Sequence, residues 1–156
     1  MNEHEALITK FYTAFQRKDY HAMAALYHPE ATFRDGAFDL HSGKEAGAMW
    51  KMLLTASKDL RIEFQDVKAD EQTGSARWDA WYTFSKTGRP VHNVIRARFE
   101  FKDGLIYRQT DHFNFWRWSR QALGAPGLLL GWSGFLHNKV RATAMKGLKD
   151  FMAKDK

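Results

Sequence analysis

The segment from Gly104 to Trp118 places a carboxylate in what its residue pattern predicts to be a long, buried strand. Side chains of a strand alternate between its two faces. The face that carries Asp111 also carries Leu105, Tyr107, Gln109, Phe113 and Phe115. A buried carboxylate costs free energy unless it is paired or used chemically. We therefore expect this segment to combine part of the core with a functional group.

The length and composition restrict the class of protein. At 156 residues the chain is most simply one domain with a sizeable core. The absence of cysteine excludes disulfides, a thiolate nucleophile and a cysteine-ligated metal. The first residues carry acids and no long apolar run, so we predict no export signal and a cytoplasmic location. No apolar run approaches the roughly 20 residues that span a bilayer.

Four segments show features of helices. Apolar residues recur at helical spacing from Ala6 to Arg17, and Asp19 is expected to cap a short second helix that ends at His28-Pro29. A third helix follows Ser42, where a Ser-x-x-Glu spacing is typical of a capping box. The last predicted helix is amphipathic and spans Gly134 to Lys154.

Between the helices, alternating apolar residues predict strands. A short strand is expected from Ala31 to Asp35, and longer ones around Leu60–Phe64, Ala76–Phe84 and Ile95–Phe101. Asp103-Gly104 is a strong hairpin signal. Helices followed by a meandering antiparallel sheet predict an α+β domain.

Several function classes lack their sequence signatures. The seven histidines show no spacing that would place two with a carboxylate on one helix face, so we predict no metal site. No phosphate loop, dinucleotide fingerprint or nucleic-acid motif is present, and we expect neither a cofactor nor a nucleic-acid partner. From Lys139 to Lys156 six basic residues accompany two acidic ones, which we interpret as the solvated face of the terminal helix.

The order of these elements resembles the nuclear transport factor 2-like superfamily and, within it, the SnoaL-like proteins. Three strings carry the resemblance, which extends to Gly124: FYTAFQRKDYHAMAALYHPEATFRD, the Ser-Gly-Lys-Glu helix start and QTDHFNFWRWSRQALG. The resemblance implies a cone-shaped fold in which N-terminal helices pack in a strongly curved antiparallel sheet, with an apolar pocket and commonly a homodimer. We therefore predict a SnoaL-like domain over residues 1–124 and a helical extension over residues 125–156 that packs on it.

The resemblance also implies catalytic residues. Asp111 matches an acidic residue of the last strand that SnoaL-like cyclases are understood to use for acid/base work. Asp35 falls where ketosteroid isomerases place their base, but the isomerase oxyanion hole does not carry over, because Phe11 and Ala97 stand near the positions of its tyrosine and neutral aspartic acid. Limonene epoxide hydrolases have a similar last-strand acid, yet the preceding strand here offers arginines and no aspartate.

Asp111, Asp35 and His112 are thus the catalytic candidates, although strand alternation points His112 away from Asp111. The pocket implied by the resemblance would be lined by Phe11, Tyr12, Trp50, Trp78, Trp81, His92 and Phe113. We predict a cofactor-free isomerase, cyclase or hydrolase that acts on a small hydrophobic molecule. The alternative is a non-catalytic module that binds a hydrophobic ligand or a protein. Asp111 would then be structural, accepting a hydrogen bond from Trp50, Trp81 or a backbone amide.

The chain beyond Pro126 combines a dense apolar patch with the basic terminal helix. The patch comprises Leu128, Leu129, Leu130, Trp132, Phe135 and Leu136. It could lie in a membrane interface, cover the pocket mouth as a lid, or extend a dimer interface. We favour packing within the chain or dimer over membrane contact, because Gly131 and Gly134 interrupt any long amphipathic helix there.

Overall fold

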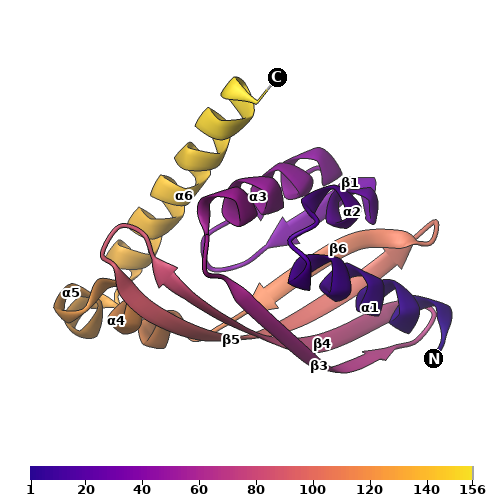
Figure 1. Ribbon diagram of the computed structural model, residues 1–156, viewed down its shortest axis with the longest axis horizontal. Helices are drawn as coiled ribbons and strands as arrows, with labels where there is room; N and C mark the ends of the chain where they lie inside the picture. The colour runs from indigo at the N-terminus through magenta and orange to yellow at the C-terminus, as the bar shows by residue number, and fades with distance from the viewer. Residues whose placement is uncertain (156) are drawn as a thin grey trace.

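A single curled, unclosed sheet forms the frame of the computed structural model, which describes residues 1–155, and helices α1 to α3 lie against one side of that sheet (Figure 1). The strand order is β2-β1-β6-β5-β4-β3. The strands are β1 (Tyr27–Arg34), β2 (Asp39–Leu40), β3 (Arg61–Ala69), β4 (Thr73–Phe84), β5 (Arg89–Lys102) and β6 (Leu105–His112). We call the side facing these helices the inner face of the sheet. The opposite side is the outer face.

The helices begin where the sequence supplies caps. They are α1 (Glu3–Gln16), α2 (Tyr20–Ala25), α3 (Gly43–Ala56), α4 (Phe115–Leu123), α5 (Ala125–Leu130) and α6 (Gly134–Lys154). Asp19 accepts a hydrogen bond from the Ala22 amide at the start of α2. At α3 the predicted capping box is present, because Ser42 accepts from the Glu45 amide and Glu45 accepts from the His41 amide. The predicted bounds of α6 are confirmed.

The sheet is mixed, which corrects the expectation of a purely antiparallel one. Strands β3 to β6 form the predicted antiparallel meander. Strand β1, however, pairs with β6 in parallel, with Phe33 opposite Gln109. The chain leaves β1 and passes through β2 and α3 before the meander begins, so β1 is free to join the exposed edge of β6 in the same direction.

Strand β6 is shorter than predicted and contains a bulge. Ile106 lies opposite Phe101 while Arg108 lies opposite Glu100, so Tyr107 is an extra residue in the ladder. The bulge places Ile106, rather than the predicted Leu105 and Tyr107, among the fully buried side chains, whereas Gln109 and Asp111 are buried as expected. The strand ends at His112 because Asn114 caps α4 by accepting from the Arg117 amide.

Aromatic side chains fill the space between the helices and the inner face. Phe11 of α1 is fully buried and makes edge-to-face contacts with Tyr12, Tyr27, Trp50 and Phe99. Edge-to-face packing directs the positive ring edge at the negative ring face. These rings join two helices to β1 and β5, so the core depends on contacts distant in sequence.

Helix α6 packs on the rest of the protein through one face. Leu148 is 2% exposed in the main core, and His137 Nε2 lies 2.8 Å from the Gly36 carbonyl oxygen. The apolar patch before and at the start of this helix is different, because Leu129, Trp132 and Phe135 are 66%, 77% and 74% exposed. We expected packing within the chain or in a dimer to bury the patch, and packing within the chain does not bury these three residues.

The docking of α6 predicts a difference between two leucines. Leu148→Ala should lower the free energy of unfolding by about 2–5 kcal/mol, because it removes buried methyl groups and leaves a cavity. Leu129→Ala, at an exposed position of α5, should change it by less than about 0.5 kcal/mol. Urea denaturation of both variants measures this contrast. Equal small effects would mean that α6 does not pack on the core in solution.

Candidate functional site

Asp111 lies on the inner face of β6, opposite Ala97 of β5. Its side chain is 3% exposed. Its Oδ1 atom accepts a hydrogen bond from Gln109 Nε2 at 3.3 Å, whereas Oδ2 has no hydrogen-bond partner within residues 1–155. A buried carboxyl group with a free oxygen is unusual in a folded protein and points to a functional role.

A chain of side-chain hydrogen bonds fixes the amide that contacts Asp111. Trp50 Nε1 donates to Tyr27 Oη at 2.9 Å, and Tyr27 Oη donates to Gln109 Oε1 at 2.5 Å. Because its oxygen is engaged by Tyr27, Gln109 turns its NH₂ group toward Asp111. Of the donors considered for a structural Asp111, neither Trp50 nor Trp81 bonds it, since Trp50 bonds Tyr27 and Trp81 lies on the outer face.

Two further buried polar atoms beside Asp111 lack partners among the described residues. These atoms are Tyr12 Oη and Trp78 Nε1. The indole N–H of Trp78 lies close enough to lower the pKa of Asp111, although its geometry falls short of a hydrogen bond. The negative charge of Asp111 in turn contributes to a raised pKa of Tyr12, after burial as the main cause. The same aromatic core thus holds two unpartnered donors and one unpartnered acceptor.

Burial is the main reason why the pKa of Asp111 lies well above its ordinary value of 3.8. The charge of Asp35 raises this pKa further, while Gln109 and Trp78 lower it. Burial and the charge of Asp35 outweigh the effects of Gln109 and Trp78, because little solvent reaches the carboxyl group. Asp111 therefore holds its proton to a higher pH than an exposed aspartate does.

Asp35 directly follows β1 and shapes a turn. Its Oδ1 accepts hydrogen bonds from the amides of Ala37 and Phe38, both at 2.7 Å. Burial raises the pKa of Asp35, and these two bonds, together with the charges of Arg141 and His137, oppose that rise. Helix α6 therefore brings two basic side chains toward the turn that holds Asp35.

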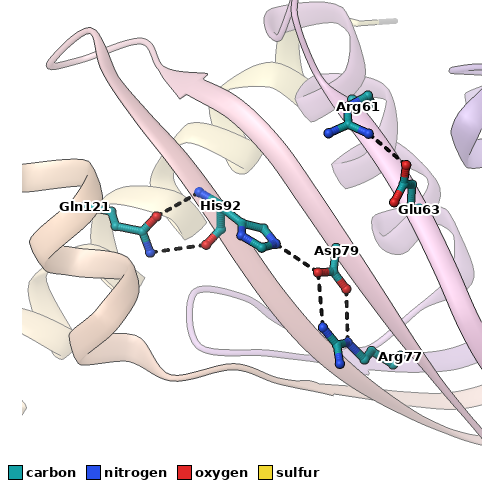
Figure 2. Close-up of polar contacts among 6 residues, drawn as sticks. All are labelled: Arg61, Glu63, Arg77, Asp79, His92 and Gln121. Carbon is teal, nitrogen blue, oxygen red and sulfur yellow. Dashed lines mark hydrogen bonds and ion pairs between the residues drawn. The ribbon is translucent and has the colours of Figure 1, made fainter.

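The outer face of the sheet holds three of the predicted site residues, away from Asp111. His92 Nε2 lies 2.9 Å from Asp79 Oδ2, and Arg77 also bonds Asp79 (Figure 2). Trp81 stacks on the His92 ring with centroids 4.5 Å apart. His112 is exposed and pairs in register with Arg96. The structure thus corrects the prediction that Trp81 and His92 line a pocket with Asp111, and places His112 outside it.

The remaining predicted pocket residues lie on the inner side. Phe11, Tyr12, Trp50 and Trp78 are buried around the Asp111 site. Phe113 is half-buried beside the turn after β1, where a Cβ atom added to Gly36 would lie 2.9 Å from its ring. Two surface hollows lie elsewhere: one of about 1270 Å³ between α2, α3 and α6, and one of about 560 Å³ near Thr73 and Arg98.

Sequence reasoning found Asp111 but missed the residues that prepare it. Gln109 was placed on the correct face without a role, and Tyr27 was assigned only to the second helix. Both become visible only when β1 and β6 pair, since they are 82 positions apart. Arg141 was treated as one of several solvated bases, yet its Nε atom is buried and without a partner among residues 1–155. No group of His, Asp or Glu side chains within these residues could hold a metal ion.

The fold and the buried carboxyl group define an α+β protein whose curled sheet encloses an acidic site, and comparison with known proteins names the family. The family described as SnoaL-like domain matches residues 8–109, and the chain belongs to it. The match ends two residues before Asp111. A comparison with curated proteins finds no matching sequence.

Solved structures share the fold at low sequence identity. A candidate polyketide cyclase from Xanthomonas campestris pv. campestris is 22% identical with a TM-score of 0.62, covering 74% of this chain and 93% of that one. An LEH-like epoxide hydrolase from M. tuberculosis is 17% identical with a TM-score of 0.62, covering 81% and 92%. An NTF2-like protein of unknown function from Burkholderia pseudomallei is 15% identical with a TM-score of 0.67, covering 79% and 99%. These similarities establish the nuclear transport factor 2-like cone.

The raised pKa of Asp111 predicts a specific pH dependence of stability. Below the ordinary aspartate pKa, Asp111 is protonated in both the folded and the unfolded protein. As pH rises, the carboxyl group of the unfolded protein ionises first, because the pKa is raised only in the folded protein. The free energy of unfolding therefore falls until pH passes the folded-state pKa. Asp111→Asn should therefore flatten the fall in the urea midpoint as pH rises above the ordinary aspartate value of 3.8. A variant with the wild-type slope would show that Asp111 ionises normally.

Asp79 is a control, because its pKa is shifted in the opposite direction to that of Asp111. Burial raises its pKa, but the bonds from Arg77 and His92 outweigh burial and leave the pKa lowered. Asp79 therefore contributes to the free energy of unfolding at pH values above its pKa in the unfolded protein. This contribution is lost as pH falls through its pKa in the folded protein. Asp79→Asn should thus cost most stability near neutral pH and least in acid.

Two buried tyrosines should respond differently to loss of the hydroxyl group. Tyr27→Phe removes the acceptor of Trp50 and the donor to Gln109, so the free energy of unfolding should fall by about 1–3 kcal/mol. Tyr12→Phe removes an unpartnered hydroxyl and should leave stability unchanged or raised. Denaturant titration of both variants is the measurement. A large loss for Tyr12→Phe would show that its hydroxyl is satisfied within the fold.

Proposed function

We propose that this protein is a cofactor-free acid/base enzyme, an isomerase, cyclase or hydrolase, that acts on a small hydrophobic molecule. The observation that carries the proposal is the Asp111 carboxyl group, which is buried with a raised pKa and one free oxygen. The surrounding aromatic side chains would exclude water and suit an apolar substrate. Membership of the SnoaL-like family, with a fold shared by a candidate cyclase and an epoxide hydrolase, supports the same class of reaction.

The environment of Asp111 suits proton transfer to or from a bound molecule. A carboxyl group with a raised pKa retains a proton that it can donate, and after ionisation it is a stronger base than an exposed aspartate. Gln109 holds Oδ1, so Oδ2 is the atom that would exchange a proton with substrate. If a C–H bond of the substrate lay at Oδ2, the ionised carboxylate would remove its proton. If a substrate oxygen lay there, the protonated carboxyl group would donate a proton to it.

The two free donors supply the complementary charge stabilisation. When a base removes a proton next to a carbonyl group, negative charge develops on the carbonyl oxygen. Tyr12 O–H and Trp78 N–H are buried donors without partners among residues 1–155, and we assign them to that oxygen. They would replace the isomerase oxyanion hole, whose residues this chain lacks at Phe11 and Ala97.

Asp35 is assigned an assisting, electrostatic part. Its Oδ1 already accepts two backbone hydrogen bonds, so this oxygen is committed to the turn. Its charge nevertheless helps to raise the pKa of Asp111. Asp35 is thus a positioning residue, and Asp35→Asn should shift the pH profile of the reaction toward acid instead of abolishing the reaction.

A binding module is the second candidate function. The same free groups, Asp111 Oδ2, Tyr12 Oη and Trp78 Nε1, would anchor the polar end of an apolar ligand without turnover. Ligand binding alone would raise the melting temperature by mass action. The predicted homodimer and cytoplasmic location are compatible with either function and stay predictions.

The proposed chemistry can be tested with two simple probes. Deuterium exchange of indanone in heavy water reports proton abstraction next to a carbonyl group, and hydrolysis of styrene oxide reports acid-assisted epoxide opening. We expect the protein to accelerate one of them and Asp111→Asn to slow it by about 10²–10⁴-fold. His112→Ala, at an exposed position on the outer face, is the matched control and should retain the wild-type rate.

An assay that needs no substrate completes the test. Carbon-13 NMR of the labelled Asp111 carboxyl group should show titration well above the ordinary aspartate range. Ordinary titration near pH 4, together with wild-type rates in Asp111→Asn, would refute the catalytic role. Raised titration and thermal stabilisation by indanone without turnover would instead favour the binding module.

A further inference from the structure

Figure 1 shows α4, α5 and the start of α6 together at one end of the protein. A group of large apolar side chains in and between these elements is exposed to solvent. The group comprises Leu128, Leu129, Leu130, Trp132 and Phe135, each between 45% and 77% exposed, and we call it the α5 tip. Contiguous exposed apolar side chains of this size mark an interaction surface. No helix within residues 1–155 is long and apolar enough to cross a membrane.

The α5 tip is framed by positive charge. Between Asp111 and Asp150 the chain carries six Arg or Lys residues and no Asp or Glu. Arg120 stacks over the Trp116 ring at 4.6 Å, and Trp116 in turn donates to the Leu128 carbonyl oxygen, so this cation lies beside the tip. Lys139 follows Phe135 by one helical turn on α6, which places both on the same side of that helix.

The β4–β5 hairpin places another cation, Arg89, close to α4 and α5. Arg89 Nε donates to the Gln121 carbonyl oxygen at the end of α4, and its guanidinium lies beside Gly124. Between Asp79 and Glu100 the sequence again contains only basic charged residues. Arg89 and Arg120, from segments far apart in the chain, therefore place cations beside α4 and α5.

This combination argues against a second copy of the chain as the occupant. A two-fold dimer places the same patch on both sides of the interface. Pairing two α5 tips would bring the flanking arginines and lysines of both copies together without a carboxylate from these segments, and like charges at an interface are repulsive. The surface requires a partner that is apolar in its interior and negatively charged at its boundary.

We propose that the α5 tip is a peripheral docking site for an anionic lipid bilayer surface. Leu129, Trp132 and Phe135 would enter the boundary between headgroups and acyl chains, while Arg89, Arg120 and Lys139 contact anionic headgroups. Trp132 suits this boundary, because its indole N–H is bonded to the Leu129 carbonyl oxygen and its ring is exposed. Gly131 and Gly134 limit the inserted segment to a short wedge instead of a long surface helix.

Sedimentation with vesicles tests the site in the full-length protein. We expect binding to vesicles of phosphatidylcholine mixed with phosphatidylserine, weak binding to phosphatidylcholine alone, and release by salt. Trp132→Ala combined with Phe135→Ala should weaken binding by about ten-fold or more, because apolar insertion is lost. Arg120→Gln should weaken it by about five-fold. Trp fluorescence should shift to the blue with anionic vesicles, and Trp132→Phe should remove that shift.

Two control variants test whether vesicle binding depends on the α5 tip or on any exposed apolar or basic side chain. Leu53→Ala removes an exposed apolar side chain of α3, and Lys10→Gln removes an exposed cation of α1; both should bind vesicles as the unmodified protein does. Circular dichroism of every variant should match the parent, because the altered side chains are exposed. Equal binding to neutral and anionic vesicles, or no binding to either, would overturn the proposal. So would self-association without lipid that Trp132→Ala abolishes, since that result identifies a second copy as the occupant.

Discussion

The cost of burying the Asp111 carboxyl group is the constraint on which much of this structure depends. An isolated charge in an aromatic core is unfavourable, so burial raises the pKa of this carboxyl group. The hydrogen-bond chain from Trp50 through Tyr27 and Gln109 links α3, β1 and β6 at this point. Within the described residues this chain of bonds leaves Asp111 Oδ2 without a partner, and the proposed function rests on that atom.

The two faces of the sheet divide the ionisable groups into two kinds. On the outer face Asp79 is paired with Arg77 and His92, and its pKa falls (Figure 2). On the inner face Asp111 meets no cation at hydrogen-bond distance within residues 1–155, and its pKa rises. The two aspartates lie on strands of the same sheet and differ because Asp79 is paired with basic side chains whereas Asp111 is surrounded by aromatic rings.

The C-terminal helices extend the family fold in two directions. One side of α6 covers the turn after β1 through His137 and brings Arg141 toward Asp35. The start of the same helix and α5 face solvent with apolar side chains among cations. A single extension of this kind can connect the region near the acidic site with an external surface, since both are built on one continuous helix.

The sequence by itself determined the α+β class, the starts of α2, α3 and α6, the meander and the inward direction of Asp111, because caps and side-chain periodicity are local properties. It placed Phe11, Tyr12, Trp50 and Trp78 in the interior for the same reason. Only the tertiary structure decided that β1 pairs in parallel with β6, that a bulge at Tyr107 shifts the face of Ile106, and that Gln109 holds Asp111. It also placed Trp81 and His92 on the outer face and left the α5 tip exposed. These outcomes depend on contacts between residues far apart in the chain, which no local pattern contains.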